Sequence, residues 1–285
     1  MRDDFAVFII SHGRAGQVDT LETLKRRGYG GKWFVVVDNE DEQQERYIGE
    51  YGAENVVVFD KQEYIDKVDT ISTSGERKTP LFARNAVCDI AKQKGLKFFA
   101  MYDDDLTRLS YRYEGGGKLR AKDIQKLDEI FEEMISFMGF ANIDAMAFTN
   151  AGGLIGGVQG RWSEGLRRQG ANTYILRTDR EYPFIGVYNE DMNFSLLLAS
   201  AGKLVFEYTH VCFYAPERGS NSGGLSETYK SKNWYYINFH SVVCCPWCCK
   251  TTKKDSLQVS WRNALPMIIN ERWKKSCEMT LPFSS

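Results

Sequence analysis

Three consecutive carboxylates, Asp103, Asp104 and Asp105, are the residues of this sequence best suited to chemistry. They follow the apolar run 97–102, which has the composition of a buried strand. Neighbouring carboxylates repel one another, and a divalent cation or a cationic ligand would neutralise them. Because alternate side chains of an extended segment point to the same side, we expect Asp103 and Asp105 to share one ion while Asp104 faces away. An acidic, solvated loop is the alternative.

A second group with ligand chemistry is the cysteine cluster at 244–249. The chain has seven cysteines, an odd number that does not fit the disulfide framework of a secreted protein, so reduced thiols are the first interpretation. The two-residue gap between Cys245 and Cys248 suits a shared zinc ion, although distant residues would have to complete the tetrahedron. A structural Zn²⁺ is a second hypothesis and a redox dithiol a third. The candidate zinc ligands are Cys244, Cys245, Cys248 and Cys249.

The elements that must position the carboxylates alternate along the first half of the chain. Apolar runs predict strands at 5–10, 33–37, 55–59 and 97–102, and helical spacing predicts helices at 18–24, 42–51 and 81–94. This alternation indicates a parallel α/β sheet with its ligand at the carboxyl ends of the strands. The second half is less regular, with a flexible Gly115–Gly117, a helix ending near 138, a strand at 145–149, a helix at 189–200 and a strand at 203–208.

Composition and charge restrict the class of protein. The chain is 285 residues long, 43% hydrophobic and 26% charged, which is typical of a globular protein. No apolar run approaches 18 residues and the N-terminus is acidic, so we expect neither membrane insertion nor secretion, and a cytoplasmic location. The net charge is −1, yet segment 228–277 carries nine basic and two acidic residues. That segment suits a polyanionic partner, or is a solvated charged face.

Several motifs occur together in an order that carries a resemblance. A strand ends in Ser11-His12-Gly13-Arg14, a second ends in Asp38, Arg84-Asn85 precedes the triple aspartate, and Glu190-Asp191 opens a later helix. Over about residues 5–210 this order resembles a GT-A-fold glycosyltransferase. The Arg-Asn pair followed by three aspartates is similar to the phage TET-associated glycosyltransferases, thought to modify hydroxymethylated pyrimidines in DNA. The implied fold is α/β and GT-A-like, a Rossmann-like and mostly parallel sheet, with a basic, cysteine-containing C-terminal extension.

The resemblance implies a metal and donor site. Asp103 and Asp105 would hold Mn²⁺ or Mg²⁺ against the diphosphate of a nucleotide sugar, with Asp105 the direct ligand and His210 a third ligand. Such a metal neutralises the leaving diphosphate. A lone histidine beside a strand is otherwise an ordinary core or surface residue. The remaining implied donor-binding residues are Ser11, His12, Gly13, Arg14, Asp38, Arg84 and Asp104.

Individual roles follow from the same resemblance. Asp38 would accept hydrogen bonds from the base or ribose. Arg84 would contact phosphate or orient a carboxylate, and its alternative is a surface salt bridge. Asp191, with Glu190 as the alternate, would be the general base that takes the proton of the acceptor hydroxyl, which implies inversion. An acidic first turn of a helix is the ordinary alternative for that pair.

The resemblance also suggests how the chain is divided and what it modifies. We expect a glycosyltransferase domain at 1–225, with a nucleotide-sugar half at about 1–110 and an acceptor half at 111–225, before an extension at 226–285. Lysines interleaved with aromatic residues in the extension suit DNA. The predicted reaction moves a sugar from a UDP-sugar to a hydroxymethylated base in DNA, in the host cytoplasm if the protein is encoded by a phage. Alternatives are a protein, lipid or saccharide acceptor, a nucleotidyltransferase, and a noncatalytic nucleic-acid-binding protein.

Overall fold

A computed structural model describes residues 1–72, 75–216, 234–253 and 256–264. Within these residues one large sheet has the strand order β3-β2-β1-β4-β9-β7-β10-β5-β6, with β8 paired to β10. The strands are β1 (Phe5–Ile10), β2 (Lys32–Asp38), β3 (Val56–Phe59), β4 (Phe98–Asp103), β5 (Arg108–Gly115), β6 (Lys118–Asp123), β7 (Ala145–Asn150), β8 (Leu166–Arg167), β9 (Tyr174–Arg177) and β10 (Val205–Tyr214).

Parallel pairing dominates the part of the sheet that the first half of the chain forms. β1 pairs in parallel with β2 and β4, and β2 with β3. β7 and β10 are parallel as well, but β9 lies antiparallel between β4 and β7. The α/β class and the parallel strands at 5–10, 33–37, 55–59 and 97–102 are therefore confirmed, and the carboxyl ends of β1, β2 and β4 lie along one edge.

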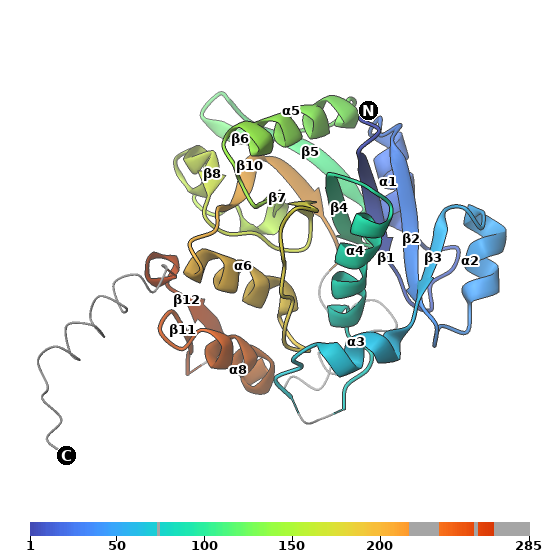
Figure 1. Ribbon diagram of the computed structural model, residues 1–285. Helices are drawn as coiled ribbons and strands as arrows, with labels where there is room; N and C mark the ends of the chain where they lie inside the picture. The colour runs from blue at the N-terminus through green and yellow to red at the C-terminus, as the bar shows by residue number, and fades with distance from the viewer. Residues whose placement is uncertain (73–74, 217–233, 254–255, 265–285) are drawn as a thin grey trace, which may run out of the picture.

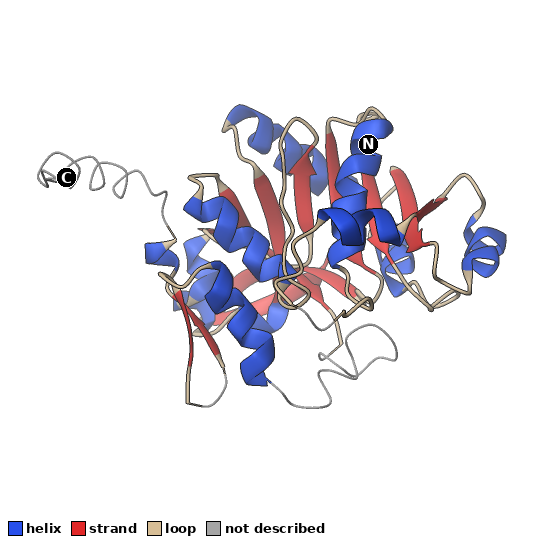
Figure 2. Ribbon diagram, turned by 60° about the horizontal axis from the view of Figure 1, so that its bottom comes forward, coloured by secondary structure: helices blue, strands red, loops and turns tan. Residues whose placement is uncertain are grey.

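Helices cover both faces of the sheet, as Figures 1 and 2 show. They are α1 (Asp19–Arg26), α2 (Gln44–Tyr51), α3 (Lys61–Lys67), α4 (Leu81–Gln93), α5 (Leu127–Phe140), α6 (Glu190–Ser200) and α8 (Trp234–Cys244). All six residues of β1 are buried, and alternate side chains enter two different apolar cores. Phe5 packs in one core with Phe131 of α5, and Phe8 in the other with Phe82 of α4. Burial on both faces explains why β1 is a continuous apolar run rather than an alternating one.

Two expectations for the second half were wrong. The glycines at 115–117 belong to a hairpin that joins β5 to β6, in which Gly116 and Gly117 have φ of 65° and 73°. Positive φ at consecutive turn positions favours glycine because it has no Cβ, so this segment is a defined turn rather than a flexible linker. The predicted strand at 203–208 instead extends to Tyr214, and His210 lies inside β10 rather than at its end.

The C-terminal extension packs on α6 through an apolar cluster. Its described part contains α8, a small hairpin of β11 (Cys249–Thr251) and β12 (Leu257–Val259), and a 3-10 turn at Trp261–Asn263. Other 3-10 turns lie at Ala151–Gly153, Gly157–Gln159 and Arg161–Glu164. Cys245, Cys248 and Cys249 are buried with Leu196 and Ala199 of α6.

The zinc hypothesis is not supported by this packing. The described part of the chain contains no group of three or more His, Cys, Asp or Glu residues arranged to hold a metal ion. Burial raises the pKa of Cys245 and Cys249 above the ordinary value of a thiol. The cysteines therefore contribute apolar packing, as free thiols commonly do.

Among the described helices, none is long and apolar enough to cross a membrane.

Candidate active site

The triple aspartate lies at the carboxyl end of β4, where α1 holds its backbone. Thr20 Oγ1 donates to the carbonyl oxygen of Asp103 at 2.6 Å, and the Thr20 amide donates to that of Asp104 at 3.0 Å. The amide of Leu106 donates back to Thr20 Oγ1 at 2.9 Å. Thr20 is fully buried, so these hydrogen bonds hold the loop after β4 against α1.

Asp104 turns into the protein and ties the loop after β1 to the triple aspartate. Its Oδ2 accepts from Ser11 Oγ at 2.5 Å and its Oδ1 from Arg14 Nη1 at 2.6 Å. Because the single hydroxyl hydrogen of Ser11 is given to Asp104, the contact of 2.8 Å between Ser11 Oγ and Tyr47 Oη is donated by Tyr47. Tyr47 Oη also accepts from the Arg14 amide at 2.8 Å. Ser11 and Asp104 are 5% and 4% exposed, so these two side chains shape the loop.

Asp103 and Asp105 offer carboxylate oxygens, the ligands that Mg²⁺ and Mn²⁺ prefer, although the described residues contain no group of three or more His, Cys, Asp or Glu arranged to hold a metal ion. Asp103 is 34% exposed at its side chain. Burial, and then the neighbouring carboxylates of Asp103 and Asp104, raise the pKa of Asp105 to about 6. A cation beside Asp105 would relieve this cost, and Mg²⁺ characteristically uses one or two carboxylates together with phosphate oxygens.

Arg84 joins these aspartates to a second pair of carboxylates. It is 1% exposed, its Nη2 donates to Asp103 Oδ1 at 2.9 Å, and its Nε donates to Glu190 Oε1 at 2.9 Å. Burial would lower the pKa of Arg84, but the charges of Asp103, Glu190 and Asp191 outweigh it and raise the pKa above its usual value. Arg84 Nη1 is buried and has no hydrogen-bond partner among the described residues. The guanidinium thus links β4, α4 and α6 through buried ion pairs, so the alternative of a surface salt bridge does not hold.

Glu190 and Asp191 open α6 directly after Asn189, which adopts φ 53°. Both carboxylates are buried, at 5% and 4% exposure. Burial raises the pKa of Glu190, while its ion pair with Arg84 opposes that change. Asp191 Oδ1 accepts from the Met192 amide at 2.7 Å. Glu190 is therefore held by Arg84 of α4, whereas Asp191 Oδ1 contacts the backbone of its own helix.

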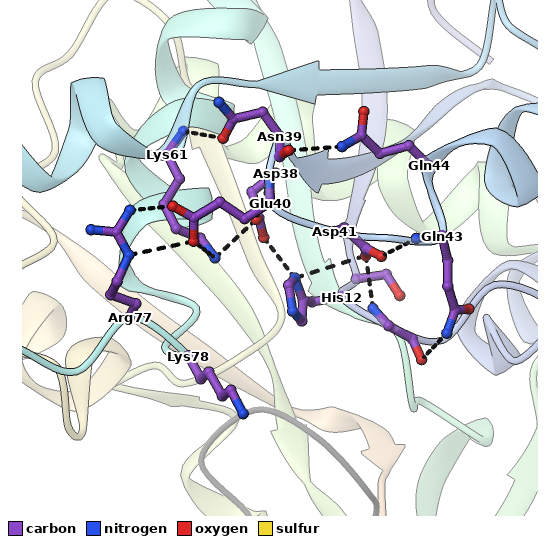
Figure 3. A network of polar contacts seen from close by, with 12 residues as sticks. His12, Asp38, Asn39, Glu40, Asp41, Gln43, Gln44, Lys61, Arg77 and Lys78 are labelled. Carbon is purple, nitrogen blue, oxygen red and sulfur yellow. Dashed lines mark hydrogen bonds and ion pairs between the residues drawn. The ribbon is translucent and has the colours of Figure 1, made fainter.

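A third polar group lies at the carboxyl ends of β1 and β2 (Figure 3). Asp38 ends β2 and accepts from His12 Nδ1 at 2.7 Å, from Lys61 Nζ at 2.9 Å and from the Glu40 amide at 3.0 Å. Asp41 accepts from the Gly13 amide at 2.7 Å and holds the loop after β1. The side chain of Asp38 is 7% exposed and that of His12 is 37% exposed. The group that this edge presents outward is therefore His12 rather than Asp38.

His210 is not brought to the triple aspartate, which corrects its expected role as a metal ligand. β10 is separated from β4 by β9 and β7, so three strand spacings of about 4.8 Å each lie between them. The ring of His210 instead contacts Trp162 and Tyr208, with centroids 4.8 and 5.4 Å away. The described residues contain no metal-binding group of three that would include it.

Tyr47, Lys61 and Thr20 belong to the site but were missed in the sequence. Tyr47 lies within α2 and Lys61 begins α3, a helix that the apolar pattern did not indicate. Neither residue stands in a motif. Tyr47 reaches Ser11 across 36 positions in the chain, and the Lys61 amide reaches Asn39 across 22. A buried lysine, 4% exposed, is a signal that only the folded structure provides.

The fold is similar to that of several solved structures at low sequence identity. No curated protein matches the chain. Similar solved structures include S. aureus TarS 1-349 in complex with UDP-GlcNAc, at 15% identity over 84% of this chain and 66% of that chain, with a TM-score of 0.45. A second is the mannosyltransferase PcManGT from Pyrobaculum calidifontis in complex with GDP-Man and Mn²⁺, at 10% identity over 84% of this chain and 63% of that chain, with a TM-score of 0.48. A third is glucosyl-3-phosphoglycerate synthase from Mycobacterium tuberculosis in complex with Mg²⁺ and UDP, at 11% identity over 93% of this chain and 91% of that chain, with a TM-score of 0.44.

The chain spans 65–66% of the length of the TarS chains that it matches. The family model described as TET-Associated Glycosyltransferase matches residues 5–224, which include β1, the triple aspartate and Glu190-Asp191. The chain belongs to the family of TET-associated glycosyltransferases.

Proposed function

We propose that the protein transfers a sugar from a nucleotide sugar to an acceptor hydroxyl with the help of a divalent metal. One observation carries the proposal: Arg84 binds both Asp103, from the triple aspartate, and Glu190, next to Asp191. A single buried guanidinium therefore holds the carboxylates of a donor site beside those of an acceptor site.

The residues divide the work between the two substrates. Asp103 and Asp105 would hold Mn²⁺ or Mg²⁺, which when bound neutralises the diphosphate that leaves. Asp104 keeps the loop after β1 against this site through Ser11 and Arg14. Asp191 takes the proton of the acceptor hydroxyl as the new bond forms, which gives inversion at the sugar carbon. In this arrangement 1–110 forms the donor half and 111–225 the acceptor half.

The acceptor we propose is a hydroxymethylated base in DNA, and the first donor to test is a UDP-sugar. The name of the family suggests DNA modification, and a DNA acceptor would place the reaction in the cytoplasm of a phage-infected host. The extension offers Lys250 and Lys253, which are exposed. The other basic residues of segment 228–277 lie outside the described residues or have undescribed side chains.

Donor hydrolysis and product analysis test this function in sequence. The protein is incubated with Mn²⁺ and UDP-, GDP- and other nucleotide sugars, first without acceptor and then with DNA that contains hydroxymethylcytosine. Nucleosides from the digested DNA are analysed by mass spectrometry, with unmodified DNA as the control. A hexose on hydroxymethylcytosine alone is the expected product. Donor hydrolysis without any modified nucleoside would point to a protein, lipid or saccharide acceptor, and the absence of both reactions contradicts the proposal.

A separate measurement examines the role of the extension in binding DNA. Replacing Lys250 and Lys253 by Ala should weaken DNA binding and flatten its salt dependence, because each neutralised phosphate contributes about 0.9 to the slope of log affinity against log salt. Lys118 and Lys122, two exposed lysines of β6, form a matched control pair. Equal DNA affinity and salt slope for the Lys250/Lys253 variant and the wild type would remove the extension from DNA binding.

A further inference from the structure

The segment that leads into Glu190 and Asp191 is anchored in α8, and Asn189 makes the first contact. Asn189 is buried and has φ 53°, a left-handed conformation that asparagine adopts more readily than most residues. Its Nδ2 donates to the carbonyl oxygen of Ile237 at 3.2 Å and to Asn238 Oδ1 at 3.3 Å. The side chain of Asn189 therefore ties the turn at the start of α6 to α8.

Asn193 makes the second contact, one turn further along α6. Its Nδ2 donates to the carbonyl oxygens of Ile185 and Tyr188, both at 3.1 Å. Its Oδ1 faces the other way and accepts from Ser241 Oγ of α8 at 2.8 Å. Asn193 and Ser241 are both fully buried. Ser241 thus fixes the orientation of a side-chain amide that holds the segment before α6.

Aromatic packing completes the contact between α8 and this segment. The buried ring of Tyr188 meets the rings of Tyr236 and His240 edge-on, with centroids 5.6 and 4.8 Å away. Tyr236 and His240 are four positions apart, as are Ile237 and Ser241, so all four lie on one side of α8. That side of α8 packs against the start of α6, and Figure 1 shows the two helices next to each other.

The contacts with α8 bear on Asp191 because a general base works only at short range. It must lie within about 2.6–3.2 Å of the hydroxyl that it deprotonates, and a misplacement of about 1 Å can lower the rate about 10²-fold. Asp191 lies between Asn189 and Asn193 in the chain, so both contacts hold the backbone that carries it. α8 lies outside residues 5–224, the part of the chain that the family model matches. This support therefore comes from the extension.

We infer that α8 positions Asp191 for the transfer step. The positioning residues are Asn189, Asn193 and Ser241, which act through Asp191 and touch neither substrate. This inference rests on the proposed role of Asp191 as general base. It gives the extension a part in catalysis that is separate from any contact of its lysines with DNA.

Two variants break the contacts and keep Asp191. Ser241→Ala deletes the hydroxyl that orients Asn193. Asn189→Gly deletes the anchor in α8 but keeps the backbone conformation, since glycine adopts positive φ readily. Each should lower turnover about 5- to 20-fold, because one lost hydrogen bond among several shifts the carboxylate only slightly, and each should leave UDP affinity within about 2-fold of the wild type. Turnover is measured on DNA that contains hydroxymethylcytosine, with the donor that the hydrolysis experiment identifies, and UDP affinity by calorimetry with Mn²⁺.

Thr178→Val is the matched control. Thr178 is half-buried, and its Oγ1 donates to the carbonyl oxygen of Leu96 at 2.5 Å. This contact lies next to the start of β4, at the opposite edge of the sheet from Asp103. The control variant loses one hydroxyl, as Ser241→Ala does. It should therefore lower the free energy of unfolding in urea by a similar amount and keep the turnover of the wild type.

A double-mutant cycle with Asp191→Asn separates positioning from a general structural effect. Neither Ser241→Ala nor Asn189→Gly should lower the residual turnover of Asp191→Asn further, because the base that they position is already absent. Loss of turnover by the same factor in both backgrounds would overturn the inference, as would wild-type turnover of both single variants or an equal loss in Thr178→Val. In these cases Asp191 remains the proposed base. If Asp191→Asn itself turns over at the wild-type rate, the proposed base is wrong and the inference falls with it.

Discussion

Arg84 Nε donates to Glu190 Oε1 at 2.9 Å, although the two residues are 106 positions apart in the chain. Arg84 comes from α4 and Glu190 from the first turn of α6. Both are almost fully buried, so the ion pair fixes the start of α6 against the helix that precedes the triple aspartate. The position of Asp191 depends on this contact.

Removing the charge of Arg84 should destabilise the fold. In Arg84→Met the buried carboxylate of Glu190 loses its partner, and breaking a buried pair typically costs about 3–5 kcal/mol. Urea denaturation at pH 8 measures the free energy of unfolding. Arg84→Lys, the control, keeps the charge but cannot bind two carboxylates through a planar fork, so an intermediate loss is expected. A change below about 1 kcal/mol for Arg84→Met would show that Glu190 finds another way to be neutralised.

Asp191→Asn should lower turnover by about 10²–10⁴ and leave donor affinity nearly unchanged, because a general base acts on the acceptor proton. Steady-state kinetics and UDP calorimetry measure the two effects separately. Glu190→Gln is the comparison, and it should disturb stability through Arg84 as well as turnover. An equal loss of donor affinity and turnover in Asp191→Asn would exclude the role of general base.

Asp105→Asn should stabilise the protein in EDTA at pH 8 by about 1 kcal/mol and abolish stabilisation by Mn²⁺. The folded chain raises the pKa of Asp105 from 3.8 to about 6, so the ionised carboxylate opposes folding above pH 6, and this cost disappears below pH 3.8. Asp104→Asn is the contrasting variant, since it weakens the bonds to Ser11 and Arg14 and should destabilise with or without metal. Thermal unfolding with and without Mn²⁺ provides the test, and Mn²⁺ stabilisation of Asp105→Asn equal to that of the wild type would contradict it.

Tyr47→Phe removes one hydroxyl that serves two partners, Ser11 Oγ and the Arg14 amide. Because these buried groups lose a partner, we expect the free energy of unfolding to fall by about 1–2 kcal/mol and UDP affinity to fall with it. Tyr113→Phe on β5, where the side chain is 43% exposed, is the matched control and should change neither quantity. If both variants behave alike, the hydroxyl of Tyr47 does not organise the loop after β1.

Packing of α8 should weaken in mild acid through His240. Its Nδ1 donates to the Tyr236 carbonyl oxygen at 3.0 Å, and its Nε2 is buried without a partner in the described part of the chain. Burial lowers the pKa of His240, so the stabilisation is complete above pH 6.5 and is lost as pH falls below it. Hydrogen exchange of α8 amides between pH 7 and 5, corrected for intrinsic rates, should show this loss in the wild type and not in His240→Phe. His210→Gln is the control. Burial lowers the pKa of His210 as well, but His210 lies in β10, so this variant should leave the loss of α8 protection in acid unchanged. Protection of α8 that stays constant to pH 5 would contradict the prediction.

The amino-acid sequence by itself determined the elements that end at the site. The apolar runs at 5–10 and 97–102 and the helical spacing at 81–94 are local patterns. The runs therefore predict strands, and the spacing predicts a helix, without knowledge of their neighbours in the fold. Since carboxyl ends of parallel strands share an edge, the grouping of the loop after β1 with Asp38 and Asp103 could also be predicted. Asp104 is buried against Ser11 and Arg14, but it lies with Asp105 in a turn after β4 and not in the extended segment that the expected alternation of side chains assumed.

Only the tertiary structure decided which charges meet. The antiparallel insertion of β9 between β4 and β7 separates His210 from the aspartates, and no local pattern encodes the order of strands in a sheet. The pairing of Arg84 with Glu190, and of Lys61 with Asp38, joins residues from separate elements. Each pair forms because packing buries both members, and a buried charge is tolerated only beside its opposite. Local propensity sets the elements, whereas desolvation in the assembled core selects the partners of each charge.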